Sequence, residues 1–190
     1  MSAKDKINDF QTPKDVAKYM VNMLPKEVDY VLEPTPGLGT IVNELQLKGI
    51  RVAAPRDFFL MDQNLSFPAV VMNPPFSKPS CILENAPVEY QKLKGMSIGY
   101  QILFDCMQKS DIIIALMPWY TISDSDVRMR SIKKFGLKSI TALPRKTFQY
   151  ARIQTCVLEL RKGWKKDTLF HAYEFMYDGK GYIEPTLNFK

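Results

Sequence analysis

The sequence predicts an α/β fold with a doubly wound, mostly parallel sheet, and three features of the chain favour it. Short apolar runs at 30–32, 69–72 and 111–118 have the composition of buried strands. The first run leads into a glycine-containing loop and a helical segment, the order in which such a sheet holds a ligand at its carboxyl edge. With 190 residues and 46% apolar content, the chain suits one domain with a full core. We therefore expect a single domain that spans residues 1–190.

A helix is predicted at 14–24, ahead of the first strand. Thr12 is a suitable N-cap, Pro13 suits the first helical position, and Pro25 ends the segment. Its apolar residues recur with the spacing of one buried helix face: Val16, Tyr19, Met20, Met23 and Leu24. Taken alone, the segment predicts only a well-capped helix.

The strand at 30–32 leads into a carboxylate and a glycine loop. Glu33 follows the strand, and Gly37 and Gly39 let the backbone approach a ligand closely. In the next helix, three residues are predicted to share a face and a glycine to end it: Ile41, Leu45, Leu47 and Gly49. The spacing is not the Gly-x-Gly-x-x-Gly of dinucleotide enzymes, and no Gly-Lys-Ser/Thr follows, which argues against a phosphate-binding loop.

The strand at 69–72 is followed by Asn73, Pro74, Pro75 and Phe76. The asparagine side-chain oxygen and a carbonyl of the Pro-Pro unit can both accept hydrogen bonds from one planar amino group, and proline holds these acceptors in place. The aromatic ring can stack on the ring that bears the amino group. Methyl transfer to an exocyclic base nitrogen needs these features.

Together, Phe-x-Thr-Pro at 10–13, Glu-Pro-x-x-Gly-x-Gly at 33–39 and Asn-Pro-Pro-Phe at 73–76 resemble the amino-group DNA methyltransferases of the adenine (N-6) class. The resemblance covers most of the chain. It implies a Rossmann-like class I methyltransferase sheet, mostly parallel with a terminal antiparallel hairpin. It also implies S-adenosyl-L-methionine as the cofactor and methyl transfer to the exocyclic amino group of a flipped adenine in DNA.

The resemblance assigns roles to individual residues. The cofactor-binding residues that it implies are Phe10, Thr12, Pro13, Glu33, Pro34, Gly37, Gly39, Asp57 and Phe58. The catalytic residues that it implies are Asn73, Pro74, Pro75 and Phe76. Phe148 is placed like a later aromatic residue that helps hold the flipped base. The basic residues flanking it suit a phosphate backbone: Arg145, Lys146 and Arg152.

One segment departs from the family pattern. The family usually has a second strand, ending in an acid that binds the cofactor ribose, and then a helix before the segment that contains Asp57. Residues 49–57 leave no room for all of this, so we expect the second strand and its helix to be shortened or missing. A charge-assisted hydrogen bond contributes about 1.5–3 kcal/mol. Without the acid, the cofactor binds weakly, binds only with a partner present, or does not bind.

The net charge of +6 is unevenly distributed, with 12 Lys/Arg against 4 Asp/Glu between 121 and 170. Besides the residues around Phe148, one further basic cluster is predicted: Arg128, Arg130, Lys133, Lys134 and Lys138. Basic residues near a base pocket favour nucleic-acid contact over a solvated basic face. We therefore expect DNA as the partner, with RNA as the less favoured choice.

Several classes of protein are disfavoured by the residues. The three cysteines are odd in number and widely spaced, which indicates free thiols in a reducing compartment, and we expect a cytoplasmic protein. His171 is the single histidine and has no partner that suggests a triad or a metal site. No apolar run is long enough for a membrane span, and the N-terminus has no apolar signal core. We expect no metal and no membrane association.

Two other functions stay open. Guanine amino groups of ribosomal RNA and glutamine amides of proteins are methylated by enzymes with a similar Asn-Pro-Pro-aromatic turn. A catalytically inactive, methyltransferase-like subunit that binds nucleic acid is the second alternative. The sequence contains no separate target-recognition domain of the kind that sequence-specific members carry. We expect weak or short sequence specificity, or target recognition supplied by a homodimer or a partner subunit.

Overall fold

The computed structural model describes residues 11–76, 85–88, 90, 98–148, 153–172, 176–177 and 182–183. Its main sheet has seven strands in the order β2-β1-β3-β4-β6-β5-β7. These strands are β1 (Tyr30–Leu32), β2 (Arg51–Ala53), β3 (Ala69–Met72), β4 (Ile112–Pro118), β5 (Leu137–Ala142), β6 (Thr155–Arg161) and β7 (Leu169–Ala172). A separate pair is formed by β8 (Met176–Tyr177) and β9 (Tyr182–Ile183).

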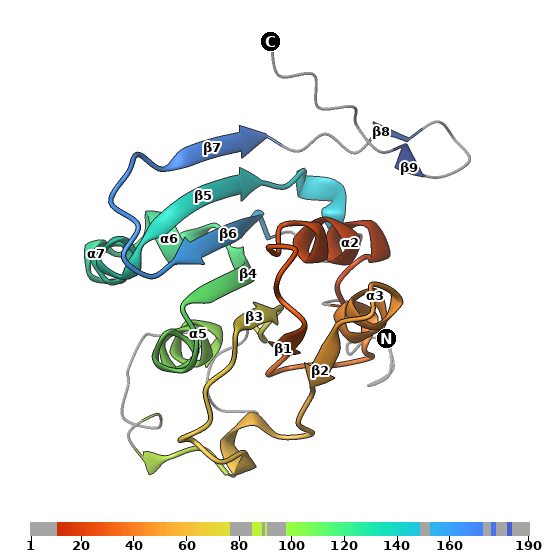
Figure 1. Cartoon of the computed structure of the whole chain (residues 1–190). Coiled ribbons are helices and arrows are strands. Elements are labelled where there is room, and N and C mark those ends of the chain that lie inside the picture. Colours follow the sequence, from red (N-terminus) through yellow and green to blue (C-terminus); the bar gives the residue numbers. More distant parts are fainter. Residues whose placement is uncertain are drawn as a thin grey trace, which may run out of the picture.

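Helices cover both faces of the sheet (Figure 1). The α-helices are α2 (Lys14–Asn22), α3 (Thr40–Leu47), α5 (Ile98–Lys109), α6 (Tyr120–Ser123) and α7 (Asp126–Phe135). Two short 3-10 helices are η1 (Phe58–Leu60) and η3 (Arg145–Thr147). Alternate residues of β3 divide the core: Ala69 and Val71 pack with α2 and α3, whereas Val70 and Met72 pack with α5. The domain is therefore an α/β/α sandwich.

The sheet confirms the predicted fold class. Strands β2, β1, β3 and β4 are parallel, while β6 runs antiparallel between β4 and β5. The antiparallel pair of β5 and β6 is the predicted hairpin. The carboxyl ends of the parallel strands meet at one edge, which we call the carboxyl edge, and ligands of such sheets bind there.

The region between β2 and β3 is shortened, as the sequence predicts. β2 has three residues and pairs directly with β1 in parallel register. The chain then passes through Ala54 and Pro55 into η1 and reaches β3 without an intervening α-helix. No acid stands at the end of β2, where Ala53 is the last strand residue.

Two local predictions about helices are wrong. Pro13, not Thr12, occupies the N-cap of α2, and no side chain caps that helix. The Thr12 hydroxyl instead accepts a hydrogen bond from Asn73, which lies far away in sequence. Leu47 is 74% exposed although Ile41 and Leu45 are buried, because six residues correspond to 240° of helix rotation and place it on another face.

Among the described residues, no helix is long and apolar enough to cross a membrane. The same residues contain no group of three or more histidine, cysteine, aspartate or glutamate side chains that could hold a metal ion. Cys106 and Cys156 are buried free thiols.

Candidate active site

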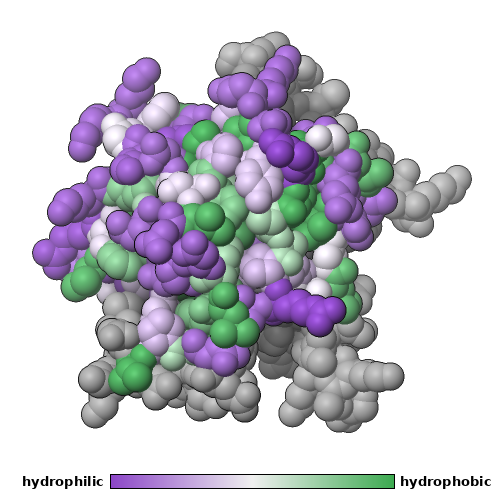
Figure 2. Space-filling view, turned by 60° about the horizontal axis from the view of Figure 1, so that its bottom comes forward, coloured by the Kyte–Doolittle hydropathy of each residue, from purple (hydrophilic) through white to green (hydrophobic). Residues whose placement is uncertain are grey.

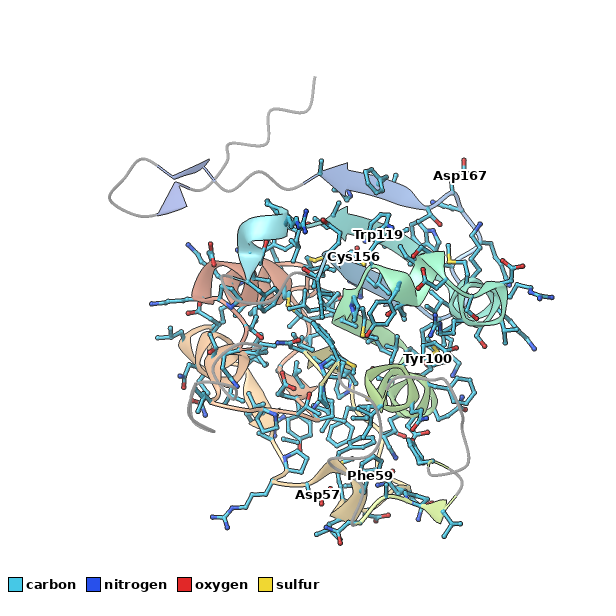
Figure 3. The ribbon with its side chains drawn as sticks, turned by 180° about the vertical axis from the view of Figure 1, so that it is seen from behind. Asp57, Phe59, Tyr100, Trp119, Cys156 and Asp167 are labelled. Atoms are coloured by element: carbon cyan, nitrogen blue, oxygen red, sulfur yellow. The ribbon has the colours of Figure 1, made fainter. Side chains whose placement is uncertain are left out.

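A cavity of about 540 Å³ lies at the carboxyl edge, where β1, β2 and β3 end. Its volume is within the roughly 300–1,000 Å³ of typical small-molecule sites. The loops after these three strands and the start of α5 line it, together with Gln11. The residues from the loops are Pro34, Thr35, Pro36, Gly37, Ala54, Arg56, Asp57, Phe58, Phe59, Asn73, Pro74 and Pro75. Figure 3 labels Asp57 and Phe59 at this end of the molecule.

The glycine loop after β1 forms one wall. Gly37 and Gly39 have φ angles of +51° and +82°, which other residues rarely adopt. Gln11 Oε1 accepts a hydrogen bond of 3.0 Å from the backbone N–H of Leu38. A Cβ atom at Gly37 would lie 2.8 Å from this Oε1 atom, so glycine is needed for the contact as well as for the turn.

Asn73 is held by the other two motifs. Its Nδ2 atom donates a 2.9 Å hydrogen bond to Thr12 Oγ1, which places Oδ1 on the acceptor side of the amide. The Asn73 carbonyl oxygen lies 3.2 Å from Thr35 Oγ1 and accepts from this hydroxyl. The three sequence motifs, which span more than sixty residues, therefore meet through Thr12, Thr35 and Asn73.

The Pro74-Pro75 turn packs directly on the first turn of α5. A Cβ atom at Gly99 would lie 2.8 Å from the Pro75 carbonyl oxygen and 3.1 Å from Pro74 Cγ. The absence of a side chain at Gly99 thus lets the helix approach the turn. On the other side, the Tyr120 hydroxyl donates a 3.2 Å hydrogen bond to the Phe76 carbonyl oxygen. Contacts from two elements therefore support the turn.

Glu33 is a buried carboxyl group beside the turn, with 1% of its surface exposed. Burial raises its pKa to about 8, although hydrogen bonds from Thr35 act in the opposite direction. It faces a small polar cavity of about 40 Å³ that Thr12 and Asn73 also line. Thr35 Oγ1 lies 3.3 Å from Glu33 Oε1. A protonated Glu33 can donate to Thr35, and that hydroxyl can then donate to the Asn73 carbonyl.

The segment that contains Asp57 closes the opposite wall. Asp57 Oδ1 accepts from the backbone N–H of Phe59 at 2.9 Å, and Oδ2 accepts from Asn85 Nδ2 at 2.7 Å. Phe58 is buried and also lines the cavity. The Phe59 ring meets the Tyr90 ring edge-on, with 5.1 Å between the ring centroids.

Two of the residues near 148 that the resemblance assigns to the substrate, Arg145 and Phe148, do not line this cavity. Phe148 is 6% exposed and packs in the apolar cluster of α2 and α3, against which Phe76 also packs. It does not line the cavity described above. Arg145 is exposed after β5, at the carboxyl edge, and Lys146 lies beside it in η3. Phe10 and Arg152 lie outside the described residues.

Two members of the predicted basic cluster are structural. Arg128 is 9% exposed, donates a 3.0 Å hydrogen bond to the Tyr120 carbonyl oxygen, and lies over the Tyr100 ring. Lys138 Nζ lies 2.9 Å from Oε1 of the buried Glu159. Both side chains therefore make contacts within the fold, and their part in a nucleic-acid surface stays a prediction.

Other lining residues were not singled out by the sequence. Gln11 and Thr35 lie at variable positions of the recognised motifs, so only their place inside those motifs could have indicated them. Ile98 and Ile102 line the cavity from α5, and Gly99 contacts the turn. Their roles depend on how the helix docks, for which the sequence has no local signal.

No protein family matches the sequence, and no curated protein is significantly similar to it. Several solved structures are similar. One is a candidate class I S-adenosylmethionine-dependent methyltransferase from Listeria monocytogenes, with 18% identity and a TM-score of 0.63, covering 87% of this chain and 66% of that chain. Another is a modification subunit of a candidate type I restriction enzyme from Vibrio vulnificus YJ016, with 20% identity and a TM-score of 0.65. The match covers 95% of this chain and 50% of that chain. A third is DrdV in complex with DNA, with 12% identity and a TM-score of 0.61, covering 89% and 28%.

This chain thus spans at most two thirds of the length of each of these proteins. At such low identities the similarity concerns the fold. The fold is that of the class I S-adenosylmethionine-dependent methyltransferases.

Proposed function

We propose that the protein transfers a methyl group from S-adenosylmethionine to the exocyclic amino group of a flipped adenine in DNA. One observation carries the proposal. The glycine loop after β1 and the Asn-Pro-Pro turn after β3 line one cavity and are joined by the contact between Thr35 and Asn73. A cofactor wall and an amino-binding turn next to each other are what such a transfer requires.

The residues around the cavity fit the cofactor in size and in chemistry. The loop at Gly37 allows close approach, and Asp57 and Phe58 offer a carboxylate and an apolar surface. Glu33 lines the small adjoining cavity and would pair with a positively charged amino group only after it releases its proton. When bound, S-adenosylmethionine supplies an electrophilic methyl group. At the end of β2, Ala54 lines the cavity where the family has its ribose-binding acid, so we expect the affinity for the cofactor alone to be low.

Asn73 and the turn would perform the acceptor side of the reaction. Asn73 Oδ1 and the Pro74 carbonyl oxygen accept one hydrogen bond each from the adenine amino group, which directs the nitrogen lone pair toward the methyl group. Thr12 fixes the orientation of the Asn73 amide through its hydroxyl, and Tyr120 fixes the Phe76 backbone. The Phe76 ring is then the stacking surface for the base. Placement of both reactants accounts for most of the catalysis, since no strong base is needed.

DNA is favoured over RNA and over protein glutamine as the substrate. The Phe-x-Thr-Pro motif belongs to the DNA adenine enzymes, and two of the similar structures are a restriction-enzyme modification subunit and a DNA complex. The intact contacts among Thr12, Thr35 and Asn73 favour an active enzyme over an inactive subunit. We propose that target recognition comes from a homodimer or a partner subunit.

Substitution of Asn73 tests the proposal. With duplex DNA and labelled S-adenosylmethionine, we expect Asn73→Ala to lower kcat by about 10²–10³, the size of effect seen when one active-site hydrogen-bonding group is removed. Asn43→Ala, at an exposed position of α3, is the matched control and should retain wild-type kcat. Full activity of Asn73→Ala would contradict the assignment. Methylation of RNA or of a protein amide, but not of DNA, would support the alternative substrates.

A further inference from the structure

Two Lys-Lys pairs that are distant in sequence meet at the edge of the sheet opposite the carboxyl edge. Lys133 and Lys134 lie in the last turn of α7, and Lys165 and Lys166 lie in the loop after β6. We call these four side chains the double-lysine patch. All four are exposed.

The backbone under the double-lysine patch is firmly connected. The N–H of Gly163 donates to the Phe135 carbonyl oxygen at 2.8 Å, and the N–H of Arg161 donates to the Gly136 carbonyl oxygen at 2.9 Å. A Cβ atom at Gly136 would lie 2.0 Å from the Arg161 carbonyl oxygen, so the two segments are in close contact. The loop after β6 is therefore fixed against the end of α7, and both lysine pairs belong to the segments that meet at this junction.

Among the described residues, no ion pair neutralises the positive charge of the patch. Nearby, Lys138 is paired with Glu159, and Lys162 is paired with Asp111. The four lysines of the patch form no salt bridge with any described residue. Figure 2 shows hydrophilic side chains covering the left of the molecule, the side on which α7 lies in Figure 1.

The double-lysine patch is remote from the cavity. β6 runs antiparallel to β4 and is seven residues long, so it carries the chain about 23 Å away from the carboxyl edge. In Figure 3, Asp167, next to the patch, and Asp57, at the cavity, lie at opposite ends of the molecule. A base held in the cavity therefore leaves the patch free to contact something else.

We infer that the double-lysine patch binds the phosphate backbone of duplex DNA away from the target base. Lysine is depleted at protein–protein interfaces but supplies phosphate contacts that carry no sequence information. Trp164 lies between the two segments of the patch, and the ammonium groups of Lys138 and Lys166 lie 5.7 Å from its ring centroid, so its ring is already engaged by cations. The inference goes beyond the proposed methylation and does not depend on it.

Charge-neutral variants of the full chain test the inference with a fluorescent 40-base-pair duplex. We expect Lys133→Gln/Lys134→Gln and Lys165→Gln/Lys166→Gln each to weaken binding about tenfold at about 0.1 M salt, and each to reduce the salt slope by about two. Lys26→Gln/Lys48→Gln is the control, because it removes the same charge from exposed residues beyond the ends of α2 and α3. This control should change affinity less than twofold.

The outcomes distinguish DNA binding by the double-lysine patch from methyl transfer in the cavity. Unchanged binding in both patch variants, or an equal loss in the control, would overturn the inference. Stronger competition by poly-glutamate than by unlabelled duplex of equal charge would also overturn it, in favour of an acidic protein partner. Loss of methyl transfer in Asn73→Ala with retained duplex binding would leave the patch supported. Patch-dependent binding without any methyl transfer by the wild-type protein would contradict the proposed function alone.

Discussion

Glu33 connects a single buried carboxyl group to the stability of the whole fold. Its raised pKa of about 8 means that the folded protein binds a proton that the unfolded chain has already released above about pH 4.5. The free energy of unfolding should therefore decrease as the pH rises from about 4.5 to about 8. The half-buried Asp105, with its pKa raised to about 6, contributes in the same direction but only in the lower part of the interval.

We predict that Glu33→Gln removes the decrease in stability between about pH 7 and pH 8, where Asp105 has largely released its proton. Urea unfolding at several pH values measures it, with the exposed Glu27→Gln as the control that retains the wild-type slope. If the free energy of unfolding depends on pH in the same way for Glu33→Gln and the wild-type protein, Glu33 is not the titrating group.

At this scale the sequence indicated which residues matter but not always what they contact. Thr12 has the chemistry of an N-cap, and local reasoning placed it there. In the fold its hydroxyl accepts from Asn73 instead, because the loop before α2 passes over the end of β3. A contact between residues this far apart in sequence has no local signature.

Among the elements, the 57–67 segment shows how a shortened sheet keeps a rigid wall without its usual helix. Gln63 Nε2 donates to the carbonyl oxygens of Phe58 and Met61, at 3.1 and 2.9 Å. The buried Lys109 of α5 donates through Nζ to the Gln63 carbonyl oxygen, and the N–H of Phe67 donates to the Lys109 carbonyl oxygen. The end of α5 thus fastens the wall of the cavity that contains Asp57 and Phe58.

We predict that Lys109→Met loosens this wall and weakens cofactor binding about five- to tenfold, since a hydrogen bond from a charged group contributes about 1.5–3 kcal/mol and only part of it is passed on to the cofactor. The KM for S-adenosylmethionine should rise while kcat changes little, and Lys109→Arg should restore part of the affinity. Steady-state kinetics with Gln108→Met as an exposed control on α5 measures the difference. A five- to tenfold fall in kcat with an unchanged KM for S-adenosylmethionine would indicate a general loss of structure instead.

The elements with strong local signals were predictable. The buried strands and the helix that Ser125 caps and Gly136 ends follow from apolar composition, capping residues and a glycine stop. The docking of α5 on the Pro74-Pro75 turn was not, because it depends on a small residue at Gly99 meeting a distant backbone.

For the whole molecule, chain order does not indicate which edge of the sheet a charge occupies. Arg145 follows β5 at the carboxyl edge, whereas the double-lysine patch lies at the other edge, although all belong to one basic stretch of sequence. The antiparallel course of β6 separates them. The basic stretch therefore does not surround the base pocket as the sequence predicted.

The reduced sheet leads to a last prediction about how cofactor and DNA binding depend on each other. Ala54 is exposed and lines the cavity directly after β2, where the family that the chain resembles has its ribose-binding acid. We predict that Ala54→Asp tightens the binding of S-adenosylhomocysteine about tenfold, at the lower end of a charge-assisted hydrogen bond of about 1.5–3 kcal/mol. Ala54→Asn, which has the same shape without the charge, should gain much less.

Calorimetric titration of these variants, alone and with duplex DNA, measures the effect. The wild-type protein should bind the cofactor more tightly once DNA covers the open side of the cavity, since exclusion of water strengthens the remaining polar contacts. Ala54→Asp should depend less on DNA, because its carboxylate contributes in either state. Equal affinities of the Asp and Asn variants would mean that the ribose does not reach this position, and that the shortened fold holds the cofactor through the walls at Gly37 and Asp57 instead.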